Sequence, residues 1–192
     1  MASAKMGAMD EGGAVLHKAI KWAEKLHRGQ DRDGPAPLPY LSHPVDVACK
    51  LRYLAGVEDP TDLCAALLHD TVEECGVHPA KIAKKFGSEV EGLVRELTRT
   101  EPSEADAAGL TPEQLWELRS RLLLEDIRRM SPRAQRIKLA DRLSNLEAAR
   151  ATRLGDRLDR YVRQSFLILE AIPRDVSPPL WDAIRQLLES SR

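Results

Sequence analysis

Three short polar stretches interrupt otherwise apolar segments of this 192-residue chain: Ser42-His43-Pro44, His69-Asp70 and Lys138-Leu139-Ala140-Asp141. A buried, ionised aspartate is unfavourable unless it is paired, hydrogen-bonded or bound to a metal. Two imidazoles and two carboxylates carried by three helices could therefore meet around one ion and leave coordination positions for water and a phosphate oxygen. Such nitrogen and oxygen donors favour Mn²⁺ or Fe²⁺ over tetrahedral zinc.

Each of these residues also has a simpler interpretation when it is taken alone. A histidine at a helix start, such as His43, is usually a cap or a surface residue, and an adjacent His-Asp pair is common by chance and usually solvated. Asp141, which precedes Arg142, could form a surface ion pair. The pattern by itself therefore leaves a metal site and a set of unrelated polar residues equally open.

The elements that would position these residues are helices. Apolar residues recur at helical spacing from Val15 onward, and no segment shows the alternation of a β-strand. The segment from Thr61 to about Val72 is apolar on all sides at its centre, which predicts a helix in the middle of a bundle. Loops are predicted at residues 30–39 and 101–109. The expected fold is all-α, with about eight to nine helices and no substantial sheet.

Composition narrows the class of protein. The formal net charge is −1, with 29 Lys and Arg against 30 Asp and Glu, so nothing favours binding to nucleic acid or to a membrane surface. Three cysteines without CxxC spacing argue against a disulfide framework, and we expect a cytoplasmic protein. The Gly- and Ala-rich residues 1–13 are predicted to be a disordered leader, and residues 14–192 a single domain.

Four segments resemble the HD superfamily of metal phosphohydrolases, and more narrowly the hydrolase domain of the RelA/SpoT alarmone enzymes and their small single-domain relatives. They are residues 27–32, 39–44, 65–74 and 137–146, and the run HDTVE within the third is far more specific than HD alone. The resemblance implies an all-α HD-domain bundle. It also implies Mn²⁺-dependent removal of pyrophosphate from the 3′ position of guanosine tetra- or pentaphosphate, giving GDP or GTP.

The resemblance also implies roles for individual residues. The metal ligands would be His43, His69, Asp70 and Asp141. Glu73 and Glu74 match the acidic pair assigned to activating water, while Arg32 and Asn145 match residues that contact the substrate. Lys138 would be either a substrate contact or a structural partner of a ligand carboxylate. Since no synthetase segment follows in this sequence, a hydrolase alone is expected.

Departures from the family pattern concern the substrate rather than the metal. The loop reads Asp31-Arg32-Asp33 where relatives often carry basic residues, and Glu147 removes a further basic position. An acidic loop should repel a polyphosphate. Two alternatives therefore stay open: a hydrolase of another nucleotide, cleaving a 2′-, 3′- or 5′-phosphate, and a nucleotide-binding module without catalysis. The oligomeric state is not predicted.

Overall fold

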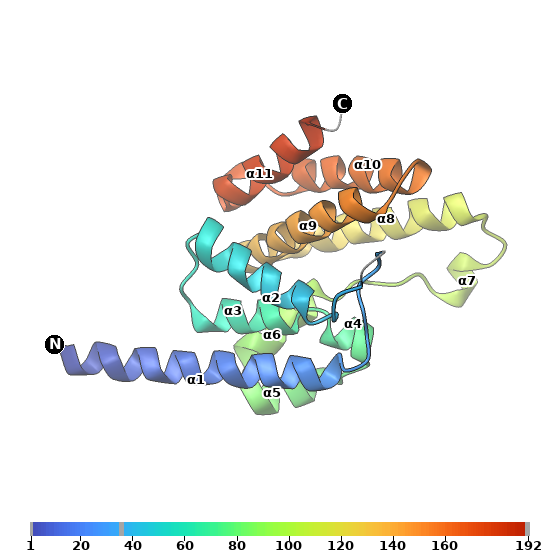
Figure 1. The fold of residues 1–192 in the computed structure, drawn as a ribbon. Helices are drawn as coiled ribbons and strands as arrows, with labels where there is room; N and C mark the ends of the chain where they lie inside the picture. Colours follow the sequence, from blue (N-terminus) through green and yellow to red (C-terminus); the bar gives the residue numbers. More distant parts are fainter. Residues whose placement is uncertain (1, 35–36, 191–192) are drawn as a thin grey trace.

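The computed structural model describes residues 2–34 and 37–190, and this part of the chain forms helices without a β-strand (Figure 1). The α-helices are α1 (Ala2–Leu26), α2 (Ser42–Cys49), α3 (Pro60–Leu68), α4 (Thr71–Cys75), α5 (Pro79–Phe86), α6 (Ser88–Leu97), α7 (Glu104–Ala107), α8 (Pro112–Arg129), α9 (Pro132–Thr152), α10 (Asp156–Ala171) and α11 (Pro178–Glu189). A π-helical turn (Lys50–Leu54) follows α2, and a 3-10 turn (Arg174–Val176) precedes α11. The all-α prediction is confirmed. None of the described helices is both long enough and apolar enough to cross a membrane.

The described chain has more helices than predicted because two short ones appear. The helix expected from Thr61 to Val72 is interrupted at His69 and Asp70, which form a turn between α3 and α4. The Thr71 hydroxyl donates to the carbonyl oxygen of Leu68 at 2.7 Å and so satisfies the end of α3. In the loop predicted at residues 101–109, Ser103 caps the single turn of α7.

The first helix is longer than expected. It begins at Ala2, so that residues 2–13, where the sequence predicts a disordered leader, continue α1. Gly12 lies where α1 approaches the start of α3, and a Cβ atom at this position would lie 3.0 Å from Cγ of Pro60. The absence of a side chain at Gly12 therefore permits the close approach of these two helices.

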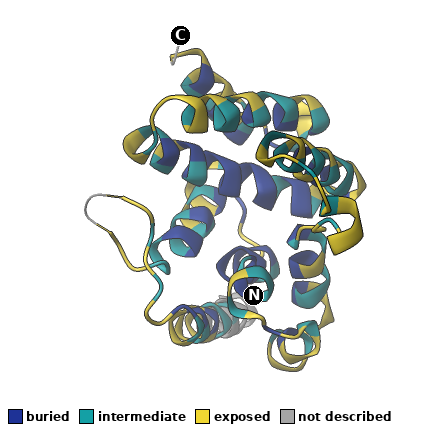
Figure 2. Cartoon of the chain, turned by 90° about the vertical axis from the view of Figure 1, so that its right-hand side faces the viewer, coloured by how far each residue is buried: buried dark blue, intermediate teal, exposed yellow. Residues whose placement is uncertain are grey.

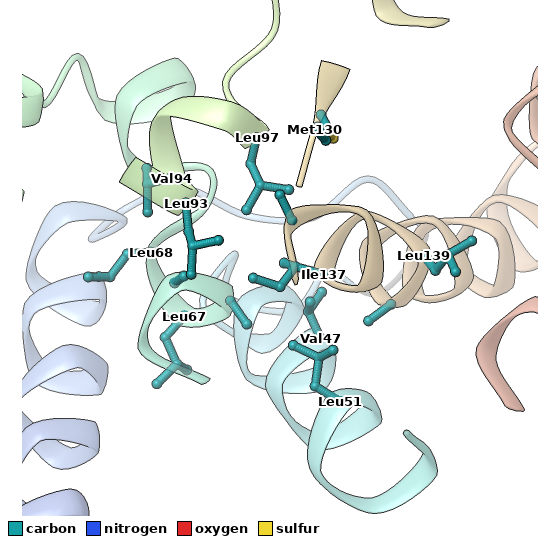
Figure 3. Packing of buried hydrophobic residues seen from close by; sticks show 14 of the residues in the cluster. Val47, Leu51, Leu67, Leu68, Leu93, Val94, Leu97, Met130, Ile137 and Leu139 are labelled. Carbon is teal, nitrogen blue, oxygen red and sulfur yellow. The ribbon is translucent and has the colours of Figure 1, made fainter. Parts of the chain in front are cut away.

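Helices α3 and α9 occupy the centre of the bundle. Residues 62–69 and 137–144 are buried without interruption, whereas the outer helices turn exposed faces to solvent (Figure 2). Val47, Leu67, Leu93 and Ile137 pack between α2, α3, α6 and α9 (Figure 3). Two of the three polar stretches thus lie on α2 and α9, and the third forms the turn after α3, so that all three reach the core.

The loop before α2 positions an aromatic residue beside that core. Pro35 and Ala36 of the predicted loop lie outside the described residues. The two segments on either side of them are joined by backbone hydrogen bonds. The Arg32 N–H donates to Leu38 O at 2.8 Å, and the Tyr40 N–H donates to Gln30 O at 2.9 Å. Ser42 opens α2, and no side chain caps the start of this helix.

Candidate metal centre

The two histidines and two aspartates from α2, the α3–α4 turn and α9 meet at one point. His43 Nε2 lies 3.5 Å from Asp70 Oδ2 and 3.3 Å from Asp141 Oδ1. His69 Nε2 lies 3.0 Å from Asp70 Oδ1 and 3.7 Å from Asp141 Oδ1. Donor atoms of His43, His69 and Asp141, all buried, lie within 4.8 Å of one another, a spacing that one metal ion could bridge.

The orientation of the imidazoles fits a cation better than a hydrogen-bonded cluster. His69 Nδ1 lies 2.8 Å from the carbonyl oxygen of Ala66, which can only accept, so Nδ1 carries a proton and donates. In the neutral ring, Nε2 then presents a lone pair to the two carboxylates. The Nε2 atoms of both His43 and His69 are buried without a hydrogen-bond partner. Lone pairs facing carboxylates repel one another unless a cation lies between them, and this donor set suits a divalent metal.

The electrostatics of the site support the same interpretation. Burial alone would lower the pKa of His69, but the carboxylates of Asp70 and Asp141 raise it to about 10. Burial would raise the pKa of Asp141, whereas Lys138 and the two histidines hold it well below its usual range. The carboxylates therefore stay ionised, and in metal-free protein a proton on the imidazole supplies the missing positive charge.

The predicted substrate residues lie around this cluster. Lys138 Nζ donates to Asp141 Oδ2 at 2.9 Å, and both side chains are buried. Asn145 Nδ2 donates to Asp141 Oδ1 at 2.5 Å, while its own Oδ1 accepts from Arg32 Nη2 at 3.2 Å. Arg32, Asn145 and Lys138 are thus connected to one carboxylate of the centre, and Lys138 and Asn145 also line the adjacent cavity.

Tyr40 contributes to the centre, although the sequence did not single it out. Its hydroxyl donates to Asp70 Oδ2 at 2.6 Å, and its ring stacks on His27 with centroids 4.7 Å apart. Burial and the neighbouring Asp70 carboxylate raise the pKa of Tyr40, which keeps the hydroxyl protonated and able to donate. Tyr40 lies in the segment 39–44, which carries the family resemblance, and this position is the sequence feature that could have indicated its role.

A cavity of about 310 Å³ opens beside Asp70 and Asp141. Its lining carries five cationic side chains and five carboxylates, and three of the cations pair with Glu73, Glu101 and Asp141. The cationic residues are Arg99, Arg119, Lys138, Arg142 and Arg153. A second cavity of about 270 Å³ shares Arg153 and Asn145 with the first and is lined by Asp31 and Asp33. The basic residues that the loop lacks are therefore supplied by other elements. Lys138 and Arg142 belong to the motif segment 137–146, whereas no motif indicated Arg99, Arg119 or Arg153.

The two glutamates after the His-Asp pair have different surroundings. Glu73 Oε1 accepts from the backbone N–H of Arg99 at 2.7 Å, and Oε2 accepts from its Nε and Nη2, each at 2.7 Å. Glu74 is exposed and lines both cavities, and in the described chain no hydrogen bond engages its carboxylate. His69 and Glu73 do not share one uninterrupted helix, because the turn at His69 and Asp70 separates α3 from α4.

Comparison with known proteins identifies the family of the chain. The HD domain family model matches residues 19–168. The chain is 39% identical over 133 residues to the human guanosine-3′,5′-bis(diphosphate) 3′-pyrophosphohydrolase MESH1, covering 69% of this chain and 68% of that protein. It is 34% identical over 180 residues to the mouse protein of the same name, covering 92% and 94%. A solved structure described as a metazoan ortholog of SpoT that hydrolyses ppGpp superimposes with a TM-score of 0.78 at 30% identity, covering 93% of this chain and 96% of that one. The chain belongs to the HD domain family.

Proposed function

We propose that this protein is a metal-dependent pyrophosphohydrolase that removes the 3′-pyrophosphate of guanosine tetra- or pentaphosphate and yields GDP or GTP. The observation that carries the proposal is the position of the His43, His69, Asp70 and Asp141 cluster at the edge of a cavity lined by four arginines and a lysine. The relatives named as guanosine-3′,5′-bis(diphosphate) 3′-pyrophosphohydrolases support the choice of substrate.

We assign the divalent ion to His43, His69, Asp70 and Asp141, and we expect Mn²⁺, with Fe²⁺ as the alternative, because the donors are two nitrogens and two oxygens. When bound, the ion lowers the pKa of a coordinated water and neutralises charge on a phosphoryl group. The protein's own part is to hold the ligands. Tyr40 orients Asp70, while Lys138 and Asn145 orient Asp141.

The cavity provides binding and charge neutralisation for the phosphates. Guanidinium groups bind phosphate oxygens through paired hydrogen bonds. Arg99, Arg119 and Lys138 pair with carboxylates of the cavity, whereas Arg142 and Arg153 form no ion pair within the described residues and are available to the phosphates of the substrate. Arg142 and Arg153 also lie over the ring of Tyr161, at 4.4 and 4.9 Å from its centroid. This aromatic support holds their planes in place along the cavity wall.

We assign proton transfer to Glu74. Its carboxylate is open to both cavities and can accept a proton from the attacking water. Glu73 has both oxygens engaged by Arg99, so it positions that guanidinium against the cavity. The acidic pair thus divides into a proton acceptor and a positioning residue.

A substrate panel with separate detection of phosphate and pyrophosphate tests the proposal. Mn²⁺-loaded protein should release pyrophosphate from guanosine tetraphosphate and little phosphate from nucleotides that carry a single 2′-, 3′- or 5′-phosphate. Phosphate release from the latter, without pyrophosphate from the former, would select a second candidate, an HD hydrolase of another nucleotide. The observation that favours this candidate is the pair Asp31 and Asp33, which line the second cavity.

A further inference from the structure

A further cavity, of about 500 Å³, lies where α8, the end of α9 and the start of α10 come together (Figure 1), and we call it the outer cavity. Its lining includes Trp116 of α8, Thr152 and Arg153 where α9 ends, and Arg157, Arg160 and Tyr161 of α10. The outer cavity and the cavity beside the metal centre share Arg153 and Tyr161. A single ligand can therefore extend from one into the other.

The charges of the outer cavity favour an anion. Three arginines line it, and Asp33 is the one carboxylate among its described lining residues. Arg160 pairs with Glu113 of α8. Arg157 is exposed, and in the part of the chain that the structure describes no carboxylate pairs with it or with Arg153. Two guanidinium groups thus face one carboxylate, and the net positive charge suits phosphate oxygens.

Aromatic rings hold two of these guanidinium groups in place. The Arg153 guanidinium lies 4.9 Å from the ring centroid of Tyr161, and that of Arg160 lies 6.0 Å from the ring centroid of Trp116. Such contacts restrict the rotation of long side chains, so less conformational freedom is lost when a ligand binds. The outer cavity is therefore partly arranged for an anion before one binds.

Three cavities meet at Arg153. This residue lines the cavity beside the metal centre, the second cavity with Asp31 and Asp33, and the outer cavity. Guanosine tetraphosphate likewise carries three groups on one ribose: the base, the 3′-diphosphate and the 5′-diphosphate. In the proposed function the 3′-diphosphate lies at the metal centre, and the carboxylates of Asp31 and Asp33 disfavour a phosphate in the second cavity. The outer cavity is then the place for the 5′-diphosphate.

We propose that the outer cavity binds the 5′-diphosphate of the substrate, and that Arg157 and Arg153 determine specificity for nucleotides that carry this group. The inference rests on the proposed function for the choice of nucleotide, but binding in the outer cavity requires no turnover. Arg157 is the residue to replace, because it lines the outer cavity alone of the three. Arg153 lines all three, so its replacement would not separate them.

The first test is a calorimetric titration of the full chain, kept metal-free with EDTA, with GDP, which carries the 5′-diphosphate, and with guanosine. We expect GDP to bind about tenfold tighter than guanosine, and Arg157→Gln to remove most of this difference without changing the affinity for guanosine. Arg157→Lys keeps the charge and should retain part of the preference. Arg121→Gln is the matched control, because Arg121 is an exposed arginine of α8 outside the three cavities.

The second test compares guanosine tetraphosphate with guanosine 3′-diphosphate, whose 5′ hydroxyl is free, as substrates of Mn²⁺-loaded protein. Arg157→Gln should raise KM for the former about tenfold, and KM for the latter and both kcat values should stay near those of the unmodified protein. An equal rise for the two substrates, or an unchanged GDP affinity in Arg157→Gln, would overturn the inference. Pyrophosphate release from neither substrate would refute the proposed function, and the GDP titration would then decide on the outer cavity alone.

Discussion

Replacement of Lys138 by methionine should destabilise the metal-free protein far more than the metal-loaded one. The Lys138 ammonium lies 2.9 Å from Asp141 Oδ2, and both side chains are less than 10% exposed. At an effective dielectric constant of 20, this pair contributes about 6 kcal/mol of Coulomb energy. Desolvation of the lysine offsets part of it, and His69 also neutralises Asp141, so we expect Lys138→Met to lower the free energy of unfolding by about 3 kcal/mol without metal.

With metal bound, the ion supplies the charge that Lys138 provided, and the loss should fall to about 1 kcal/mol. The difference of about 2 kcal/mol corresponds, by linkage, to Mn²⁺ binding about 30-fold tighter in the variant. Urea unfolding followed by circular dichroism, with EDTA and with saturating Mn²⁺, measures both values. Lys84→Met, on the exposed side of α5, is the control and should change stability by less than about 0.5 kcal/mol. Equal losses in the two conditions would refute the assignment of Lys138 as a charge partner of a metal ligand.

Three further expectations follow from single positions. Glu74→Gln should lower kcat about 100-fold, whereas Glu73→Gln should mainly raise KM because it releases Arg99. Steady-state kinetics measures both effects, and the reverse pattern would exchange the roles of the two residues. Leu68→Ala, at a fully buried position, should lower the free energy of unfolding by about 3 kcal/mol in urea titrations, and a loss below about 1 kcal/mol would contradict its place in the core. Burial raises the pKa of Cys64 to about 11, so its thiol should stay neutral and unreactive towards a disulfide reagent at pH 8. Exposed Cys49 should react under the same conditions. Labelling of Cys64 in the folded protein would disprove this expectation.

The helices that carry the site were predictable because burial leaves a pattern in the sequence. The run from Leu63 to Leu68 is apolar on all sides, and α3 is indeed buried all round. The interruption at His69-Asp70 was not predictable, because it depends on a local hydrogen bond of Thr71 and on contacts of the two polar residues with α2 and α9.

The four residues that meet at the centre, and Arg32, Lys138 and Asn145 beside them, could be named in advance from chemical type and resemblance, but most of the arginines that line the cavity could not. Arg99, Arg119 and Arg153 look like ordinary surface arginines in the sequence, and only the packing of α6, α8 and α9 brings them to one cavity. Ser144, whose hydroxyl lies 3.0 Å from His43 Nδ1, is likewise 101 residues away from it in the chain. Contacts between distant segments carry no local periodicity, so a single sequence does not reveal them.

The most direct test of the metal-dependent hydrolysis proposed here is turnover of guanosine tetraphosphate by Mn²⁺-loaded protein, with Asp70→Ala as the control and products separated by ion exchange. We expect GDP and pyrophosphate from the unmodified protein and neither from Asp70→Ala, because Asp70 contributes one of the two carboxylates facing the imidazoles. Loss of turnover on chelation and its recovery on adding Mn²⁺ should accompany this result. Equal product formation by Asp70→Ala, or no pyrophosphate from Mn²⁺-loaded protein, would contradict the account.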